Sequence, residues 1–138
     1  MTTLADIGVR LEALQAGGAT PAEAGELLSL AECVLEHWVE ARGDVPTQAR
    51  REGFRLLALH RQGCRGLPSF NACRETCREL VYHYNLLTLQ PEAAGASRHA
   101  RMMVLVANHL YLFVSGKMQA AQLGEFCCSS RPLRQEAG

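Results

Sequence analysis

Residues 20–38 read TPAEAGELLSLAECVLEHW, and this stretch shows most clearly how the chain folds. Thr20 is a typical N-cap residue, Pro21 suits the first turn of a helix, and Glu23 can reach back to the cap. Apolar residues then recur at helical spacing on one face, with acidic residues on the opposite face. The stretch therefore predicts an amphipathic helix that ends near Gly43.

A second helix start lies upstream of this stretch. Thr3 is followed three residues later by Asp6, which forms another capping-box pattern, and the pair Gly17-Gly18 predicts the end of the helix. The apolar positions between these signals form a narrow stripe of the kind that packs against a partner helix. We therefore expect this stripe to bind a protein partner or a second copy of the chain, giving a dimer. The stripe consists of Leu4, Ile7, Leu11 and Leu14.

Three more helices are expected downstream of Gly43. A run from Met102 to Val114 is apolar nearly all round, which predicts a buried central helix and is too short to span a bilayer. The expected ranges are 44–63, a segment that starts at residue 69 or 71 and stops before residue 91, and 98–118.

The fold predicted from these patterns is all-α. The chain of 138 residues suits one domain, which we place at residues 1–126 as a bundle of about five helices with a central apolar C-terminal helix. Residues 127–138 lack periodicity and are expected to form a loose tail. The N-terminus has no apolar signal-peptide core, so we expect a cytoplasmic protein with reduced thiols. The preference for arginine over lysine suggests a GC-rich bacterial genome.

Residues that can bind metals gather between His60 and Cys77. His60 and Cys64 are four residues apart, as are Cys73 and Cys77, so each pair can share a helix face. Glycine and proline between the pairs predict a turn, which would place all four side chains near the closed end of a helical hairpin. Imidazole and thiolate groups in fours are the usual ligands of structural zinc. Zinc is therefore a possible cofactor, and no other cofactor is expected.

Core packing is the interpretation that we favour for these cysteines. Cys73 and Cys77 continue the apolar stripe of their helix, and free cysteine is among the most buried residue types. A redox pair is disfavoured, because this spacing on a helix does not readily give disulfide geometry.

Charge is distributed unevenly along the chain. Residues 1–41 hold one arginine and seven acids, a net charge of −6; residues 42–79 hold eight arginines and four acids, +4; residues 80–138 hold five bases and three acids, +2. We expect the acidic and basic segments to face each other or to support self-association. Nucleic-acid binding is a further alternative, although no DNA-binding motif accompanies the basic segment. Its arginines are Arg50, Arg51, Arg55, Arg61 and Arg65.

The sequence offers no recognisable catalytic constellation. It contains no nucleophile elbow, glycine-rich phosphate loop or core-facing carboxylate pair. His83 and His109 each lie in an otherwise apolar helical segment and are expected to be hydrogen-bonded core residues. We therefore expect a small non-enzymatic interaction protein, such as a regulator, an adaptor or a chaperone. The alternatives are a zinc-binding protein and a nucleic-acid-binding regulator.

Overall fold

The structure, a computed structural model, describes residues 2–121. Within that range every regular element is helical, which confirms the predicted all-α fold. The expected loose tail at residues 127–138 and the last residues of the expected domain lie outside the described residues. The α-helices are α1 (Leu4–Gly17), α2 (Ala24–Ala41), α3 (Arg55–Gly63), α4 (Arg74–Leu89) and α5 (Ala96–Ala120), and 3-10 turns η1 (Pro21–Glu23) and η2 (Pro68–Cys73) precede α2 and α4.

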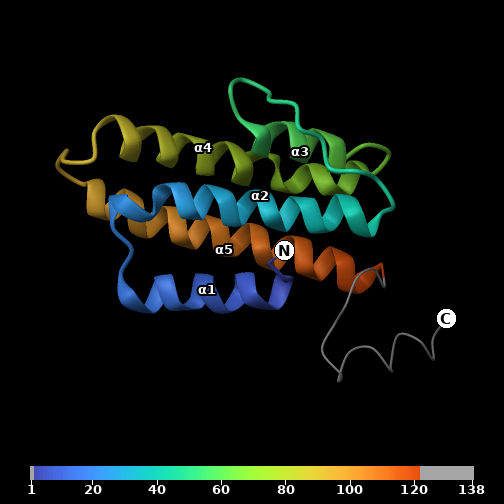
Figure 1. Ribbon diagram of the computed structural model, residues 1–138, viewed down its shortest axis with the longest axis horizontal. Helices are drawn as coiled ribbons and strands as arrows, with labels where there is room; N and C mark the ends of the chain where they lie inside the picture. The colour runs from blue at the N-terminus through green and yellow to red at the C-terminus, as the bar shows by residue number, and fades with distance from the viewer. Residues whose placement is uncertain (1, 122–138) are drawn as a thin grey trace.

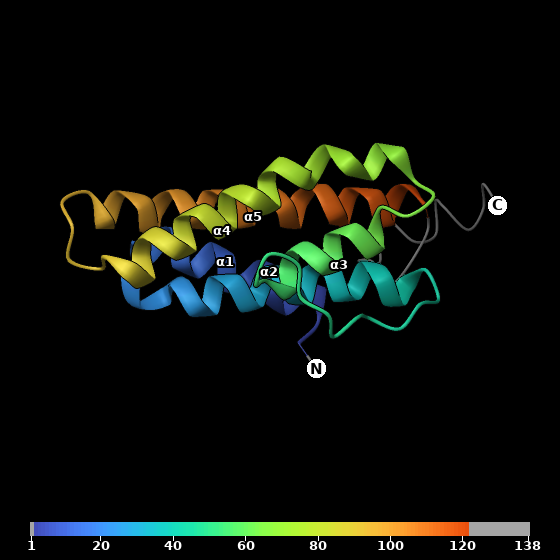
Figure 2. The ribbon, with the colours of Figure 1, turned by 90° about the horizontal axis from the view of Figure 1, so that it is seen from above.

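The helices form three tiers. Figure 1 shows α1 on one side, α2 and α5 in the middle, and α3 with α4 on the opposite side. From above, α4 runs obliquely to α2 and α5 (Figure 2). α5 packs against α1, α2 and α4, which confirms the predicted central C-terminal helix. No helix in residues 2–121 combines the length and the apolar character needed to cross a membrane.

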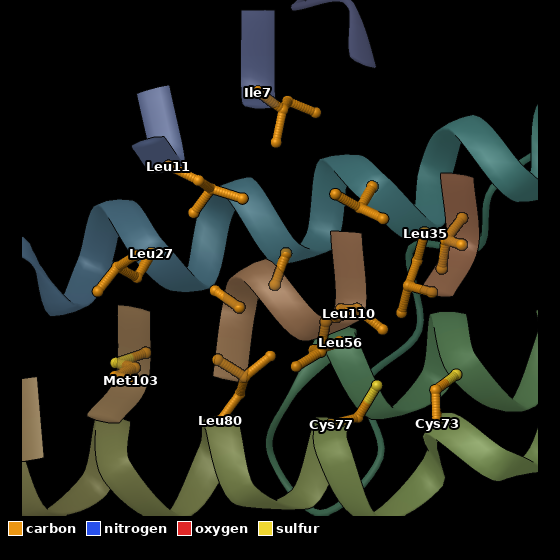
Figure 3. Close-up of a cluster of buried hydrophobic side chains, with 14 of the residues drawn as sticks. Ile7, Leu11, Leu27, Leu35, Leu56, Cys73, Cys77, Leu80, Met103 and Leu110 are labelled. Carbon is orange, nitrogen blue, oxygen red and sulfur yellow. The ribbon is translucent and has the colours of Figure 1, made fainter. Parts of the chain in front are cut away.

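The apolar stripe of α1 belongs to the core of the chain itself. Ile7, Leu11 and Leu14 are buried and Leu4 is partly buried against the same core. Figure 3 shows Ile7 and Leu11 beside α2. The stripe predicted to bind a partner is thus occupied internally, because α1 packs on both α5 and α2. A narrow stripe is what an outer helix of a bundle needs when it covers only one groove.

The start of α3 differs from the sequence expectation. Residues 44–54 were predicted to begin a helix, but α3 begins at Arg55. Residues 44–50 form an irregular connection, and residues 51–54 form a turn closed by two backbone hydrogen bonds between Arg51 and Phe54. Glu52 and Gly53 adopt positive φ angles of 54° and 86°, which a helix does not permit. Pro46 also disfavours helical geometry in the residue before it. The connection is fixed by side chains of α3, since the Gln62 side-chain oxygen accepts from the Thr47 N–H at 2.8 Å.

α5 is central but not buried on all sides. Its core face is buried, whereas Met102, Leu105 and Leu112 are 41 %, 47 % and 58 % exposed. The helix is therefore central, as predicted, but only its core face is buried. The reason is architectural, because α1, α2 and α4 cover only part of the circumference of α5 and leave one apolar side open.

The two sides of α1 give a direct test of its place in the core. We expect Leu11→Ala to lower the free energy of unfolding by about 2–5 kcal/mol, since it leaves a cavity beneath α1. Val9→Ala on the same helix, where the side chain is 69 % exposed, should change it by less than about 0.5 kcal/mol. Urea denaturation of both variants measures the difference, and equal small effects would mean that α1 is not part of the folded core.

Candidate functional site

The predicted metal-binding residues come together only in part. His60 on α3, Cys73 at the end of η2 and Cys77 on α4 are all buried in the core, where Figure 3 shows both sulfur atoms among apolar side chains. Cys64 lies apart from them. It is the C-cap residue of α3, is partly buried, and its thiol donates to the Arg61 carbonyl at 3.3 Å.

The buried thiols form a short hydrogen-bonded chain. The Cys77 thiol donates to Cys73, and the Cys73 thiol donates to the Phe70 carbonyl oxygen at 3.3 Å. The hydrogen bond from Cys77, with a further contribution from His60, lowers the pKa of Cys73 against the opposing effect of burial. The same interaction and burial raise the pKa of Cys77. His60 Nε2 lies 3.4 Å from the Phe70 oxygen, so the imidazole and both thiols share one polar island in the core.

This island does not have the form of a metal centre. Residues 2–121 contain no group of three or more His, Cys, Asp or Glu side chains placed to hold a metal ion. The arrangement instead satisfies buried polar groups inside a hydrophobic core. Zinc binding by His60, Cys64, Cys73 and Cys77 remains a prediction.

A second polar contact joins α4 to α5. His83 is buried, and its Nδ1 lies 3.0 Å from Nδ1 of His99, so one ring donates and the other accepts. The ring of Tyr82 meets both imidazoles edge-on. Burial first, and then the neighbouring His99, lower the pKa of His83, while Glu79 opposes them. The expectation of a hydrogen-bonded core histidine is thus confirmed for His83, whose partner sits on another helix and could not be identified from sequence spacing. It is wrong for His109, which is exposed on α5.

Exposed apolar side chains lie along α5 and on the neighbouring α1. We call this group the α1–α5 surface, and it consists of Val9, Met102, Leu105 and Leu112. Beside Met102 and Leu105 is a hollow of about 240 Å³ that Arg98 and Arg101 also line. Beside Val9 and Leu112 is another of about 460 Å³. Both are grooves along the boundary of the two helices, where a further side chain could insert.

Of the five arginines expected to contact nucleic acid, four line one hollow and the fifth does not. Arg55 is mostly buried, and its guanidinium lies 2.6 Å from Glu36 on α2, so it holds α3 in place. The four others, Arg50, Arg51, Arg61 and Arg65, line a hollow of about 580 Å³ beside the connection that precedes α3.

Metal binding can be tested against core packing with Cys77. If the thiols only pack, Cys77→Ala should cost about 1 kcal/mol, Cys64→Ala less, and a chelator should leave the melting temperature unchanged. If zinc is structural, each substitution and the chelator should all destabilise the protein severely, because zinc supplies about 10–16 kcal/mol in small zinc peptides. We expect the first pattern. Stoichiometric zinc with chelator-induced melting would contradict it.

The histidine pair predicts a loss of stability in acid. Because the pKa of His83 is lowered in the folded state, the unfolded chain binds more protons as the pH falls below about 6.5. The free energy of unfolding should therefore decrease between about pH 7.5 and about pH 5.5. Denaturation at several pH values measures the slope, which should be smaller in His83→Gln and unchanged in His109→Gln, a variant of an exposed histidine on α5. An unchanged slope in His83→Gln would assign the effect to other groups.

Relatives offer no independent information on these sites. Comparison of the chain with protein families, with curated proteins and with solved structures gave no match. The functional conclusions therefore rest on the residues of this chain, their geometry and their charge.

Proposed function

We propose that this chain is a non-catalytic interaction protein, a regulator, adaptor or chaperone, that binds an amphipathic helix of a partner protein on the α1–α5 surface. The observation that carries the proposal is that Met102, Leu105 and Leu112 are exposed on one side of α5, with Val9 of α1 beside Leu112. Isolated exposed apolar residues are ordinary, but a contiguous apolar surface bordered by polar residues is typical of an interaction site. This surface takes the place of the buried α1 stripe as the proposed contact.

The spacing of the surface on α5 suits a helical partner. Met102 and Leu105 are three residues apart, and Leu112 follows seven residues after Leu105, so all three share one side of the helix. Val9 on α1 borders the same groove. A partner helix lying along α5 would meet Met102 and Leu105 in one hollow and Leu112 two turns further on, with Asn108 and His109 between them, as in helix-in-groove recognition.

The charge beside the α1–α5 surface supports a partner that carries acidic residues. Arg98 and Arg101 are exposed, line the hollow beside Met102 and Leu105, and form no ion pair with any described residue. Two such guanidinium groups beside an apolar groove favour a helix that carries acidic residues next to its apolar face. The proposed partner is therefore an acidic amphipathic helix. The test must distinguish binding of such a helix from binding of a second copy of the chain.

The partner can be identified by replacing Leu105 with a photocrosslinking residue in native cells. The residue crosslinks the chain to the molecule that is bound on the α1–α5 surface. The expected product is a crosslink to a segment of another protein with apolar residues at helical spacing and neighbouring acids. A synthetic peptide of that segment should then bind the purified chain, and Leu105→Asp should weaken binding by more than about tenfold, as for a central interface residue. Arg101→Glu should also weaken binding and be rescued by an acid-to-lysine change in the peptide.

The matched control is Val45→Asp, which places the same charge at a residue that is 83 % exposed in the connection before α3. It should leave binding unchanged. Crosslinks from the chain to itself, together with a concentration-dependent dimer in sedimentation that Leu105→Asp abolishes, would replace the partner with a second copy. Equal binding by Leu105→Asp and the unsubstituted chain would refute the surface itself.

A further inference from the structure

Helices α3 and α4 form the tier farthest from α1 (Figure 1). Side chains of both helices line a cationic hollow. Its volume is about 240 Å³. The side chains that line it come from the connection before α3, from α3 itself, from η2 and from α4, so the fold gathers them from separate parts of the chain. They are Arg51, Leu57, His60, Arg61, Cys64, Asn71, Arg74 and Arg78.

The positive charge of this α3–α4 hollow is only partly neutralised. Glu52 accepts two hydrogen bonds of 2.8 and 3.2 Å from Arg78 and lies 3.8 Å from Arg51. Arg78 lowers the pKa of Glu52 most, and Arg51 and Arg74 contribute through their charge. The four arginines that line the hollow thus have one carboxylate in direct contact with them, which leaves an excess of three positive charges in this group.

Two of the four arginines are available for a ligand. Among residues 2–121, neither Arg61 nor Arg74 forms a salt bridge or a side-chain hydrogen bond, and Arg74 acts on Glu52 only from a longer distance. Arg61 comes from α3 and Arg74 from the first turn of α4. A bound anion would therefore be held from more than one side.

The donors suit an oxyanion with several acceptor atoms. A guanidinium group presents its N–H donors in a planar fork that matches phosphate and carboxylate oxygens, and the resulting charge-assisted hydrogen bonds are short and strong. Asn71 adds a side-chain amide that has no partner among the described residues. The hollow therefore combines excess positive charge with directed donors.

We propose that the α3–α4 hollow is a binding site for a small molecule that carries a phosphate or diphosphate group, with Arg61 and Arg74 as its principal ligands. The volume is below the roughly 300–1,000 Å³ of pockets for drug-sized molecules, which suits a compact group of this kind. Leu57 and the partly buried Cys64 give the wall an apolar portion that can contact the rest of the molecule.

A nucleic acid fits this surface less well than a small ligand. The cations line a concave hollow, and the exposed side of α4 beside it also carries Glu75 and Glu79. These carboxylates and Glu52 would repel a long polyanion that continued past the hollow. To bind here, a nucleic-acid strand would also have to contact the neighbouring hollow that contains Arg50 and Arg65.

Isothermal titration of the full chain with sodium pyrophosphate at fixed ionic strength tests the site, with inorganic phosphate and citrate as separate arms. We expect pyrophosphate to bind with one-to-one stoichiometry and more tightly than phosphate, and citrate to bind weakly. Arg61→Gln and Arg74→Gln should each weaken pyrophosphate binding by about tenfold or more, the effect of losing one charge-assisted interaction. Amide chemical shifts should change at residues 61–64 and 71–74.

Arg101→Gln is the matched control, because it removes one exposed arginine from α5 without touching the hollow. It should bind pyrophosphate as the unsubstituted chain does, and all three variants should keep the original circular dichroism spectrum. Absence of pyrophosphate binding at millimolar concentration, or equal loss in Arg101→Gln, would overturn the site. Tighter binding of a single-stranded oligonucleotide that Arg50→Gln and Arg65→Gln weaken as much as Arg61→Gln would replace it with a nucleic-acid surface.

Discussion

The contact of Trp38 with the end of α3 is the constraint on which the arrangement of the second half of the chain depends. The indole N–H donates to the Gly63 carbonyl at 2.9 Å, and the indole ring stacks on Phe70 with centroids 4.6 Å apart. A Cβ atom at Gly63 would lie only 2.8 Å from the indole, so this position requires glycine. Phe70 in turn contacts His60 and Phe113, which links α2, α3, η2 and α5 through one aromatic cluster.

This cluster determines where the functional side chains of the α3–α4 hairpin lie. With the end of α3 fixed on α2 and Phe70 fixed beneath it, the turn between them has little freedom, and Asn71 and Arg74 follow directly from η2. At its other end α3 is held by Arg55, whose guanidinium reaches Glu36 on α2 and whose Nε donates to the Thr47 carbonyl at 2.8 Å. The α3–α4 hollow is thus bordered by elements that contacts with the core hold in place.

Local signals in the sequence predicted the helices well, whereas contacts between distant segments could not be predicted. The capping box at Thr3 forms as expected, because cap and partner lie within one turn. The late start of α3 depends on the left-handed geometry of Gly53, which composition alone does not reveal. Helical spacing predicts only that Arg74 lies on a solvated face of its own helix. Its neighbours across the hollow lie on another helix, so the spacing could not reveal them. His83 likewise meets His99 across two helices, and helical periodicity gives no information about the register between them.

The uneven charge along the chain also has a structural explanation. Acidic residues of α2 are used to fix other helices, since Glu26 binds Arg10 of α1 and Glu36 binds Arg55 of α3. The expected attraction between the acidic and basic segments is therefore present, but only one arginine of the basic segment, Arg55, forms an ion pair with the acidic segment. The four arginines that line the α3–α4 hollow have only Glu52 in ion-pair contact, and like charges held close together oppose folding. The aromatic cluster and the apolar core hold these elements together despite this repulsion, which leaves the arginines able to interact with solvent and its anions.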